Sequence, residues 1–532
     1  MPVMTSTDAR DVELRSPVFA RPGWVGIVAA ASGGLSAAAV GLGAGEVVAG
    51  LSSSLRSPIL DVGDRVVDRV PSWAKDLAID WFGTNDKIAL LVGIAMLLAL
   101  YAAAVGVVGL RRSRRFGIAG IALFGVLGTL ASLGARTGAE LQSPLPSIVG
   151  SVVAAAALWW LGRPPADRSR RLSATVRHPS ERRRFLAQTG VLTVSAAVLG
   201  SVGRKLEARF SAADSRAAIT LPRPDVPAPA VPAGAQAEGA ASLFTPNATF
   251  YRIDTALTVP QVPAEGWELR IRGLVDRELR LSYNDLLSRS VEEHDITLTC
   301  VSNTIGGDLI GNARWIGVRL DDLLAEAGID PSADQIVGRS VDGYTCGFPV
   351  AALDGRNALV AVGMNGEPLP LEHGFPARLI VPGIYGYASA TKWLTEIELT
   401  TFDDFDHYWV PRGYAAQAPI KMQSRIDRPR GLDRIPPGPF VIGGVAWAQP
   451  TGIDRVEVKI DDGDWLTTEM AAEVNGSTWR QWSTTWDAVP GRHSIEVRAI
   501  DKNGAIQTAD RSEPLPDGAS GHHTVVVLVD ES

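Results

Sequence analysis

Cys300 is a candidate reactive residue, because its side chain is a thiol and only two cysteines occur in the 532 residues. It follows the alternating run Ile296–Thr299, which predicts a strand, and it precedes a loop that contains glycine. A thiol at such a place is expected to be presented and not buried. Free cysteine also packs as a small apolar core residue, so the residue alone leaves both interpretations open.

Cys346, the second cysteine, lies in another predicted strand, and we expect it in the core. Two cysteines make at most one bond, which excludes a disulfide scaffold. Outside the cytoplasm an unpaired thiol is exposed to oxidation unless something occupies it, and a metal is such an occupant. The net charge of -7 is weak and spread out, which gives no reason to expect a nucleic acid as partner.

The first two hundred residues concentrate the apolar, Gly-rich and Ala-rich content of the chain, whereas the remainder is typical of soluble protein. Runs of this length predict transmembrane helices, and their small residues suit close packing of helices in lipid. We place the membrane region at residues 1–203. About five spans are expected, at residues 24–51, 88–110, 116–135, 148–161 and 185–202.

The charges of the loops predict an orientation, because short cytoplasmic loops collect Lys and Arg. The turn Arg111–Arg115 and the run Arg163–Arg184 are both basic and are expected inside. The turn at residues 137–146 holds no basic residue and is expected outside. The N-terminus is then cytoplasmic, and everything after Val202 lies on the outer side of the cell membrane.

The segment Ser180–Leu186 (SERRRFL) precedes the fifth apolar run and resembles a twin-arginine export signal. Three arginines also serve as an anchor at a helix end, and both interpretations stay open. None of the seven histidines lies within a proposed span. No haem held by paired histidines is therefore expected in this chain, and electrons would pass through a separate partner.

Three further segments follow the membrane region. Residues 204–241 are rich in Pro and Ala and predict a semi-rigid tether without a core. Residues 242–425 mix short strands and helices, which indicates an α+β domain. Residues 426–532 alternate between turns and strands as in an Ig-like β-sandwich. Its adjacent residues His522 and His523 are expected to be structural or exposed, because neighbours on a strand point to opposite faces.

Five motifs occur in order after residue 242: FYR, CxxN, MNGEPLPLEHGFPARLIVPG, KW and YWVPRGY. In this order they resemble the sulfite oxidase family of molybdopterin-dependent oxidoreductases, and most closely its membrane-anchored actinobacterial members. The resemblance runs from Ser242 to the C-terminus. It implies a sulfite-oxidase fold for the α+β domain, a dimerisation-type sandwich, and molybdenum–molybdopterin as the cofactor.

The resemblance also implies a role for each matching residue. Cys300 would be the thiolate ligand of the metal, because thiolates suit a soft, redox-active centre. Arg378 would bind the phosphate of the pterin through its planar donor fork. Arg252 and Tyr414 would join Cys300 in catalysis. The residues expected to bind the cofactor are Tyr251, Arg252, Asp342, His373, Arg378, Ala390, Thr391 and Lys392.

Ile305 departs from the family pattern, which has an arginine five residues after the metal cysteine. The loss of a cation from a buried oxyanion site removes a charge-assisted hydrogen bond, worth about 1.5 to 3 kcal/mol. A less charged substrate, such as a sulfoxide, therefore competes with sulfite. Arg314 is a candidate to supply the missing charge.

The expected function is oxygen-atom transfer on a small oxo-compound by a membrane-anchored molybdenum enzyme. Two alternatives stay open: a non-catalytic binding or assembly module of the envelope that keeps the fold, and a membrane protein with an appended sensor domain. The substrate, the direction of the reaction, the electron partner and the oligomeric state also stay open.

Overall fold

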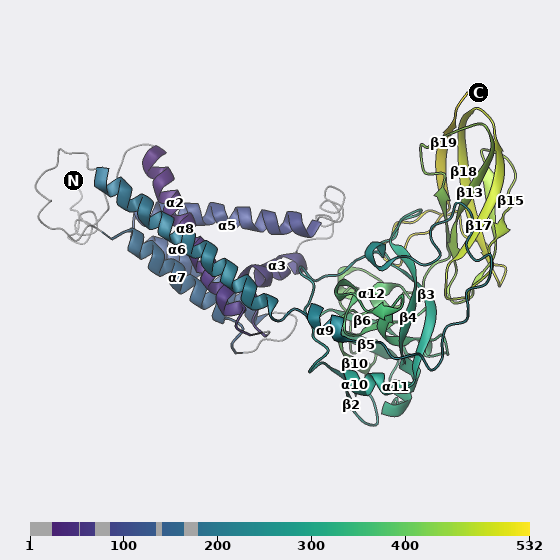
Figure 1. The fold of residues 1–532 in the computed structure, drawn as a ribbon, viewed down its shortest axis with the longest axis horizontal. Helices are drawn as coiled ribbons and strands as arrows, with labels where there is room; N and C mark the ends of the chain where they lie inside the picture. The colour runs from purple at the N-terminus through teal and green to yellow at the C-terminus, as the bar shows by residue number, and fades with distance from the viewer. Residues whose placement is uncertain (1–23, 53, 70–85, 135–140, 164–178, 532) are drawn as a thin grey trace, which may run out of the picture. The chain divides into compact units, whose positions relative to one another are not determined.

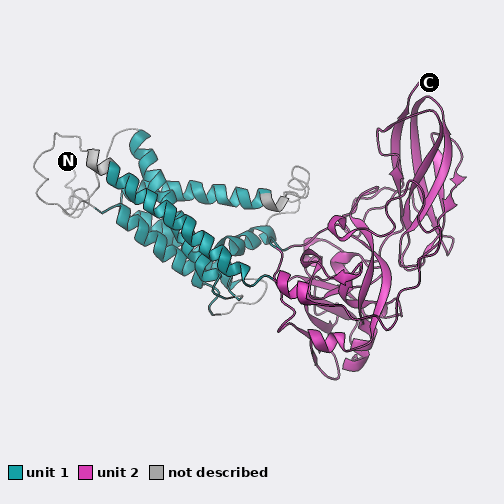
Figure 2. Cartoon of the chain, viewed as in Figure 1, with its two compact units in different colours: residues 1–211, 256–258 teal, residues 212–255, 259–532 magenta. Residues whose placement is uncertain are grey.

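The computed structural model describes residues 24–52, 54–69, 86–134, 141–163 and 179–531. The chain divides into two compact units (Figure 2), which are residues 1–211 with 256–258 and residues 212–255 with 259–532. The described part of the first unit is helical, and the second is built mainly from strands (Figure 1).

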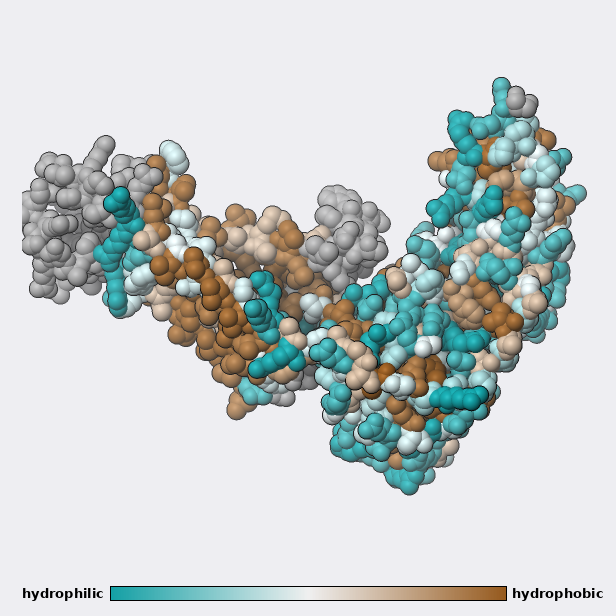
Figure 3. Space-filling model, viewed as in Figure 1, coloured by the Kyte–Doolittle hydropathy of each residue, from teal (hydrophilic) through white to brown (hydrophobic). Residues whose placement is uncertain are grey.

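The first unit contains a helix at each of the five apolar runs. These are α2 (Trp24–Ala49), α5 (Asp86–Arg111), α6 (Arg114–Leu133), α7 (Leu145–Leu161) and α8 (Pro179–Ala208). Within the described residues, four helices are long and apolar enough to cross a membrane, whereas α7 is a shorter apolar helix of 17 residues. Apolar side chains such as Leu97, Leu100 and Leu130 are exposed on these helices. Brown, hydrophobic residues cover much of the visible surface of the helical unit (Figure 3).

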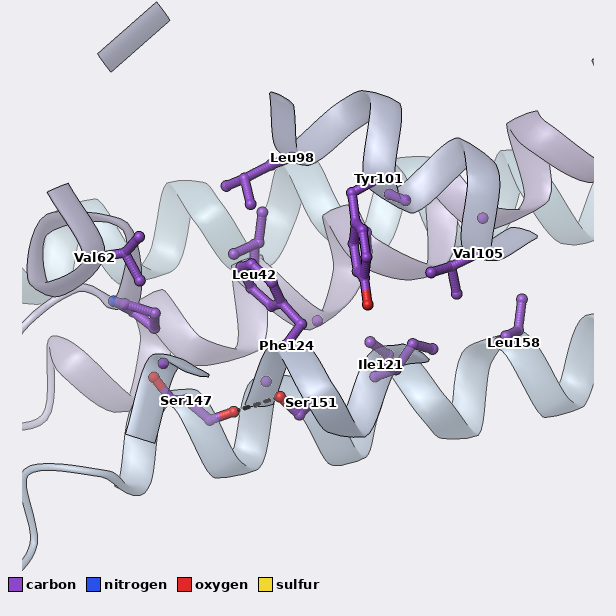
Figure 4. A pocket seen from close by; sticks show the side chains of 18 of the residues that line it. Leu42, Val62, Leu98, Tyr101, Val105, Ile121, Phe124, Ser147, Ser151 and Leu158 are labelled. Carbon is purple, nitrogen blue, oxygen red and sulfur yellow. Dashed lines mark hydrogen bonds between the residues drawn. The ribbon is translucent and has the colours of Figure 1, made fainter. Parts of the chain in front are cut away.

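Glycines let the helices of this unit approach closely. A Cβ atom on Gly34 would overlap the backbone of α5 at Ala102, and one on Gly41 would overlap the backbone of α7 at Gly150. An apolar pocket, open on one side, also lies among the helices (Figure 4). Tyr101, one of its lining residues, donates a hydrogen bond from its hydroxyl to the Gly120 carbonyl at 2.7 Å. Small residues and few polar atoms thus shape the interior of the bundle.

The short helix α3 (Pro58–Arg69) lies between α2 and α5 in the chain. Two carboxylates of α3 tie it to the preceding loop, because Arg56 lies 3.7 Å from Asp61 in the first turn and 2.7 Å from Asp64. Glu46, the acidic residue inside α2, accepts a hydrogen bond from Ser57 Oγ at 2.6 Å. Most of the basic run at 163–184 and part of the turn at 137–146 lie outside the described residues.

Two sheets form the first part of the second unit, an α+β arrangement as expected. One has the strand order β3-β4-β7-β8 with β9 against β7, and the other has the order β2-β1-β10-β5-β6. The strands of the first are β3 (Val291–Thr299), β4 (Ile310–Arg319), β7 (Leu359–Met364), β8 (Glu367–Pro368) and β9 (Arg378–Ile380). Those of the second are β1 (Glu268–Gly273), β2 (Leu279–Ser282), β5 (Gln335–Ser340), β6 (Thr345–Pro349) and β10 (Leu394–Thr400).

The core of this part lies where the two sheets and their short helices meet. Trp315 of β4 is fully buried, and its indole N–H donates to the Ile296 carbonyl of β3 at 3.1 Å. Cys346 of β6 is also fully buried, as predicted for a core residue. The short helices are α10 (Tyr283–Leu287), α11 (Leu320–Ala327) and α12 (Gly386–Ser389).

The C-terminal part is a sandwich of two sheets, with strand orders β11-β13-β17-β16 and β12-β19-β18-β14-β15. Ile442 and Trp482 from the first sheet pack with Val458, Val497 and Val527 from the second in one buried cluster. The first sheet consists of β11 (Gln423–Arg428), β13 (Gly438–Trp447), β16 (Glu469–Met470) and β17 (Arg480–Ala488). The second consists of β12 (Arg434–Ile435), β14 (Ile453–Ile460), β15 (Leu466–Thr467), β18 (Gly491–Asp501) and β19 (His523–Val529).

The segment expected to be a tether is, from Ala212 on, part of the second unit, which corrects that expectation. Its backbone makes specific contacts there. The Asp225 N–H donates to the Val291 carbonyl at 2.8 Å, and the Ala237 N–H donates to Gln481 Oε1 at 2.7 Å. A Pro-rich chain can therefore be fixed by its backbone hydrogen bonds even though it forms no sheet of its own.

Candidate active site

A pocket of about 770 Å³ lies in the α+β part of the second unit. Five chain segments that are distant in the sequence converge on it: the turn around Tyr251, the end of β3, the β5–β6 loop, the segment from His373 to Trp393, and Trp409. Seven of the expected site residues line it, and these are Tyr251, Cys300, Asp342, His373, Arg378, Ala390 and Lys392. The fold thus gathers residues that the sequence places far apart.

Cys300 comes directly after β3, and its backbone N–H donates to the Leu309 carbonyl at 2.9 Å. The residue is 6% exposed, so the expectation of a thiol presented to solvent is wrong. The side chain instead lines the pocket from a buried position. Burial raises the pKa of the Cys300 thiol, against hydrogen bonds with Ser302 that lower it. The thiol is protonated at neutral pH, and a metal that binds it must displace this proton.

Arg378 begins β9 and is 5% exposed. Its guanidinium lies 5.1 Å from the ring centre of Trp315 and donates to the carbonyls of His373 and Ala390, at 3.1 and 3.4 Å. Its Nε has no hydrogen-bond partner. Burial lowers the pKa of Arg378 to about 10. Buried cations are usually paired with an anion, whereas the hydrogen-bond acceptors of Arg378 are backbone carbonyls. An anion in the pocket would supply what this cation lacks.

His373 ends a short 3-10 helix (Leu371–His373) next to Arg378. Its Nε2 donates to the Asn247 carbonyl at 3.1 Å, and its ring meets that of Phe250 edge-on at 5.6 Å. Burial, followed by the neighbouring Arg378 cation, lowers the pKa of His373 to about 4. The imidazole is therefore neutral at physiological pH and can act as a hydrogen-bonding group but not as a counter-ion.

Lys392 follows α12 and reaches the pocket with its ammonium group. Its Nζ donates to Asp254 Oδ2 at 2.9 Å and to the Glu372 carbonyl at 3.3 Å. Burial lowers the pKa of Lys392 to about 8, and the Asp254 carboxylate opposes this shift. The same carboxylate oxygen accepts from Arg252 Nε at 2.8 Å. One carboxylate is thus shared by two cations at the edge of the pocket.

Three expected site residues lie beside the pocket and do not line it. Arg252 is held by Asp254. Thr391 is fully buried and donates from its hydroxyl to the Gly338 carbonyl at 3.4 Å. Tyr414 packs its ring against Tyr387, with 5.5 Å between ring centres.

Neither Ile305 nor Arg314 supplies a cation to the pocket. Arg314 forms a fork-like pair with Asp295, with both contacts below 3 Å, and does not line the pocket. It therefore does not supply the missing charge, which corrects that expectation. Ile305 lies against Gly521, since a Cβ atom on Gly521 would come within 2.9 Å of the Ile305 side chain.

Sequence reasoning missed several lining residues, including aromatic ones. Tyr344 donates from its hydroxyl to the Tyr387 carbonyl at 2.5 Å, and Tyr387 donates from its own to the Ala415 carbonyl at 2.7 Å. Both rings face the pocket together with Trp409. Asp254, only two residues after Arg252, was also missed, and its place beside the FYR motif was the one available indication.

The residues present fit a molybdenum–molybdopterin group. Within the described part of the chain, no three His, Cys, Asp or Glu side chains gather around one point, so a metal bound at Cys300 must take its other ligands from a cofactor. Arg378 and Lys392 offer buried positive charge to the phosphate of such a cofactor. Asn303 Nδ2 and Thr299 Oγ1, on either side of Cys300, are buried without hydrogen-bond partners.

Comparison with known proteins agrees with this site. Residues 256–409 match the family model of the oxidoreductase molybdopterin binding domain. The chain is 34% identical over 148 residues to "Uncharacterized oxidoreductase YuiH" of Bacillus subtilis, which covers 28% of this chain and 72% of that protein. It is 29% identical over 316 residues to the mitochondrial sulfite oxidase of Rattus norvegicus, covering 50% of this chain.

The chain spans 57% of the length of the sulfite oxidases of Rattus norvegicus and Homo sapiens that it matches. Among solved structures, sulfane dehydrogenase SoxCD of Paracoccus pantotrophus aligns with a TM-score of 0.48 and 23% identity, over 55% of this chain and 85% of that one.

The fold and site define a molybdopterin-dependent oxidoreductase. The chain belongs to the sulfite oxidase family, and its cofactor is molybdenum–molybdopterin.

Proposed function

We propose that this protein is a membrane-anchored molybdenum oxidoreductase that transfers an oxygen atom between water and a small oxo-compound outside the cytoplasm. The observation that carries the proposal is the single pocket in which the Cys300 thiol meets the buried cations Arg378 and Lys392. In the oxidising direction the substrate gains an oxygen atom from water, and two protons and two electrons are released. A separate electron-transfer protein takes up these electrons.

The bound cofactor supplies a two-electron redox centre that exchanges oxygen atoms. The chain contributes binding and orientation. Cys300 gives a thiolate ligand, and its buried position keeps bulk water from the sulfur. Arg378 and Lys392 hold the anionic end of the cofactor, with the neutral ring of His373 fixed beside Arg378. Tyr251, Asp342 and Ala390 complete the binding surface in this proposal, with the buried Thr391 next to Ala390. Arg252 and Tyr414, beside the pocket, are assigned to the substrate.

The wall that remains for the substrate favours a weakly charged molecule, such as a sulfoxide, over sulfite. Among the described lining residues the cations are Arg378 and Lys392, and the proposal assigns both to the cofactor. The charge of Arg252, beside the pocket, is offset by its ion pair with Asp254. Tyr344, Tyr387 and Trp409 offer aromatic rings, and the two tyrosine hydroxyls already donate to carbonyls. An aromatic wall binds apolar groups well but does not compensate the charge of an oxyanion.

The membrane helices support an anchoring role with the N-terminus inside. Arg111 closes α5 and Arg114 opens α6, which places basic residues in one short turn, as cytoplasmic turns have. The second unit then lies outside, and Ser180–Leu186 at the start of α8 serves as a twin-arginine export signal. Alkaline phosphatase fused after Ser211 is expected to be active, whereas a fusion after Arg112 is expected to be inactive. The reverse pattern would refute this orientation.

Metal and pterin analysis of the purified full-length chain tests the proposed function. A host that makes molybdopterin should yield stoichiometric molybdenum and pterin, together with dye-linked turnover of a sulfoxide or of sulfite. A folded chain without molybdenum would favour the alternative of a non-catalytic envelope module. A chain with molybdenum that turns over sulfite better than any sulfoxide would keep the enzyme class and overturn the substrate preference.

A further inference from the structure

The loop after Cys300, residues 301–309, contacts the C-terminal sandwich. Arg425 of β11 donates from Nη1 to the Gly307 carbonyl at 2.9 Å. Its Nε donates to Asp427 Oδ1 at 2.6 Å, and its side chain is only 11% exposed. A buried guanidinium fixed by a carboxylate is a rigid donor, because the ion pair restricts its rotamers. A charged hydrogen bond from the sandwich therefore holds the loop.

His523 of β19 makes a second contact with the same loop. Its Nδ1 accepts a hydrogen bond from the Ile426 backbone N–H at 3.0 Å, which fixes the plane of the ring. The ring packs so closely on Gly306 that a Cβ atom there would overlap it. Gly306 also has φ +74°, a conformation that glycine adopts without strain. The sequence predicted a structural or exposed His523, but it did not indicate this contact with the loop after Cys300.

A third set of contacts holds the strand that leads to Cys300. β3 lies at the edge of its sheet, so one side of its backbone needs partners from elsewhere. The Thr297 N–H donates to the Ser477 carbonyl at 3.0 Å, and Gln449 Nε2 donates to the Thr297 carbonyl at 2.9 Å. Asn475 Nδ2 donates to the Asp295 carbonyl at 3.0 Å. The partners come from the sandwich.

The loop itself is closed by hydrogen bonds that connect these contacts to Cys300. The Asn303 N–H donates to the Cys300 carbonyl at 3.0 Å, and Asn303 Oδ1 accepts from the Leu309 N–H at 2.9 Å. The Leu309 carbonyl accepts from the Cys300 N–H. A displacement of Gly306 or Gly307 is therefore transmitted through Asn303 and Leu309 to the backbone of the metal-ligand residue.

We propose that Arg425 and His523 are positioning residues of the metal site, and that the C-terminal sandwich holds the Cys300 loop in the conformation that directs the thiol into the pocket. The proposal takes Cys300 as the metal ligand and so rests on the proposed function. The contact between sandwich and loop is a property of the chain alone. It can therefore be tested in protein without cofactor, separately from the metal chemistry.

Hydrogen–deuterium exchange of the full-length chain, made in a host that lacks molybdopterin, tests the contact. Arg425→Gln removes the charged donor to Gly307, and His523→Asn keeps an acceptor near the Ile426 N–H while withdrawing the ring from Gly306. Amides of residues 301–309 should exchange about tenfold faster in each variant, because the loss of a charged hydrogen bond or of a packing contact favours local opening of the loop. Alkylation of Cys300, followed by peptide mass spectrometry, should accelerate in parallel.

His522→Ala is the matched control, because the His522 ring bonds to Glu496 and to the Gln507 carbonyl within the sandwich. Exchange of the loop should be unchanged in it. In the cofactor-loaded enzyme, the Mo(V) electron paramagnetic resonance spectrum should shift in the Arg425 and His523 variants and not in the control.

Unchanged loop exchange in Arg425→Gln and His523→Asn would overturn the proposal, whatever the metal content. Equal acceleration in strands β13 and β18 would also overturn it, because the sandwich as a whole would then have loosened. Loop acceleration in a chain that never binds molybdenum would keep the contact and reject the proposed function instead.

Discussion

The ammonium of Lys392 lies 2.9 Å from the Asp254 carboxylate, and the two side chains are only 10% and 4% exposed. Breaking such a buried pair by removing one partner leaves an uncompensated charge, which costs more than the pair itself contributes. We expect Asp254→Asn to destabilise the cofactor-free second unit by about 3 to 5 kcal/mol. Chemical unfolding followed by tryptophan fluorescence measures this.

The double variant Asp254→Asn, Lys392→Met removes both charges and serves as the control. It should recover most of the lost stability, because no buried charge then lacks a partner. A double variant as unstable as Asp254→Asn would show that Asp254 acts mainly through Arg252.

Arg378→Met should stabilise the cofactor-free protein, in contrast to Asp254→Asn. The Arg378 cation is buried with backbone carbonyls as its hydrogen-bond acceptors, so its replacement by an apolar side chain should raise stability by about 1 to 3 kcal/mol. The same change should abolish retention of the pterin, which pterin fluorescence after gel filtration measures. Arg314→Met is the comparison. It leaves the buried Asp295 carboxylate without its cation and should therefore destabilise the folded protein.

The stability of the second unit should fall in acid, in part through His373. Its folded pKa of about 4 lies below the ordinary value of 6.5, so between these values the unfolded chain binds a proton that the folded chain does not. The contribution of His373 to the free energy of unfolding is fully present above pH 6.5. It falls by about 3 kcal/mol as the pH decreases toward 4.

His373→Gln keeps a donor for the Asn247 carbonyl and cannot titrate. Its unfolding free energy should depend less on pH than that of the wild type between pH 4 and 6.5. Identical pH profiles would show that His373 titrates normally in the folded chain.

Cys300→Ser should eliminate turnover and deplete molybdenum, because an alkoxide is a poor substitute for a thiolate on a soft metal. The circular dichroism spectrum should stay unchanged, since the hydroxyl fits the space of the thiol. Cys346→Ala, at the other cysteine, should retain molybdenum despite a loss of about 1 kcal/mol in stability from the core. Full molybdenum content in Cys300→Ser would reject Cys300 as the ligand.

The sequence predicted those features that depend on local pattern. The apolar runs placed α2, α5, α6, α7 and α8 correctly, and the alternation before Cys300 located the end of β3. Ordered motifs led to His373, Arg378 and Lys392, which the fold does bring together.

Features that depend on tertiary contacts could not be predicted in this way. Exposure of Cys300 is set by chain segments far from it in the sequence, and the loop pattern alone suggested the wrong answer. The Pro-rich segment after Ala212 is fixed by backbone bonds to Val291 and Gln481, which composition does not show. Arg314 is neutralised by Asp295 because β3 and β4 pair in one register.

The packing of His523 on Gly306 links the loop after Cys300 to a strand that is synthesised much later than Cys300. A nascent chain that ends before residue 523 lacks this contact, so on the proposal above its Cys300 loop is held less firmly. Insertion of the cofactor would then follow completion of the chain. This order of events agrees with the proposed twin-arginine export, which carries folded proteins.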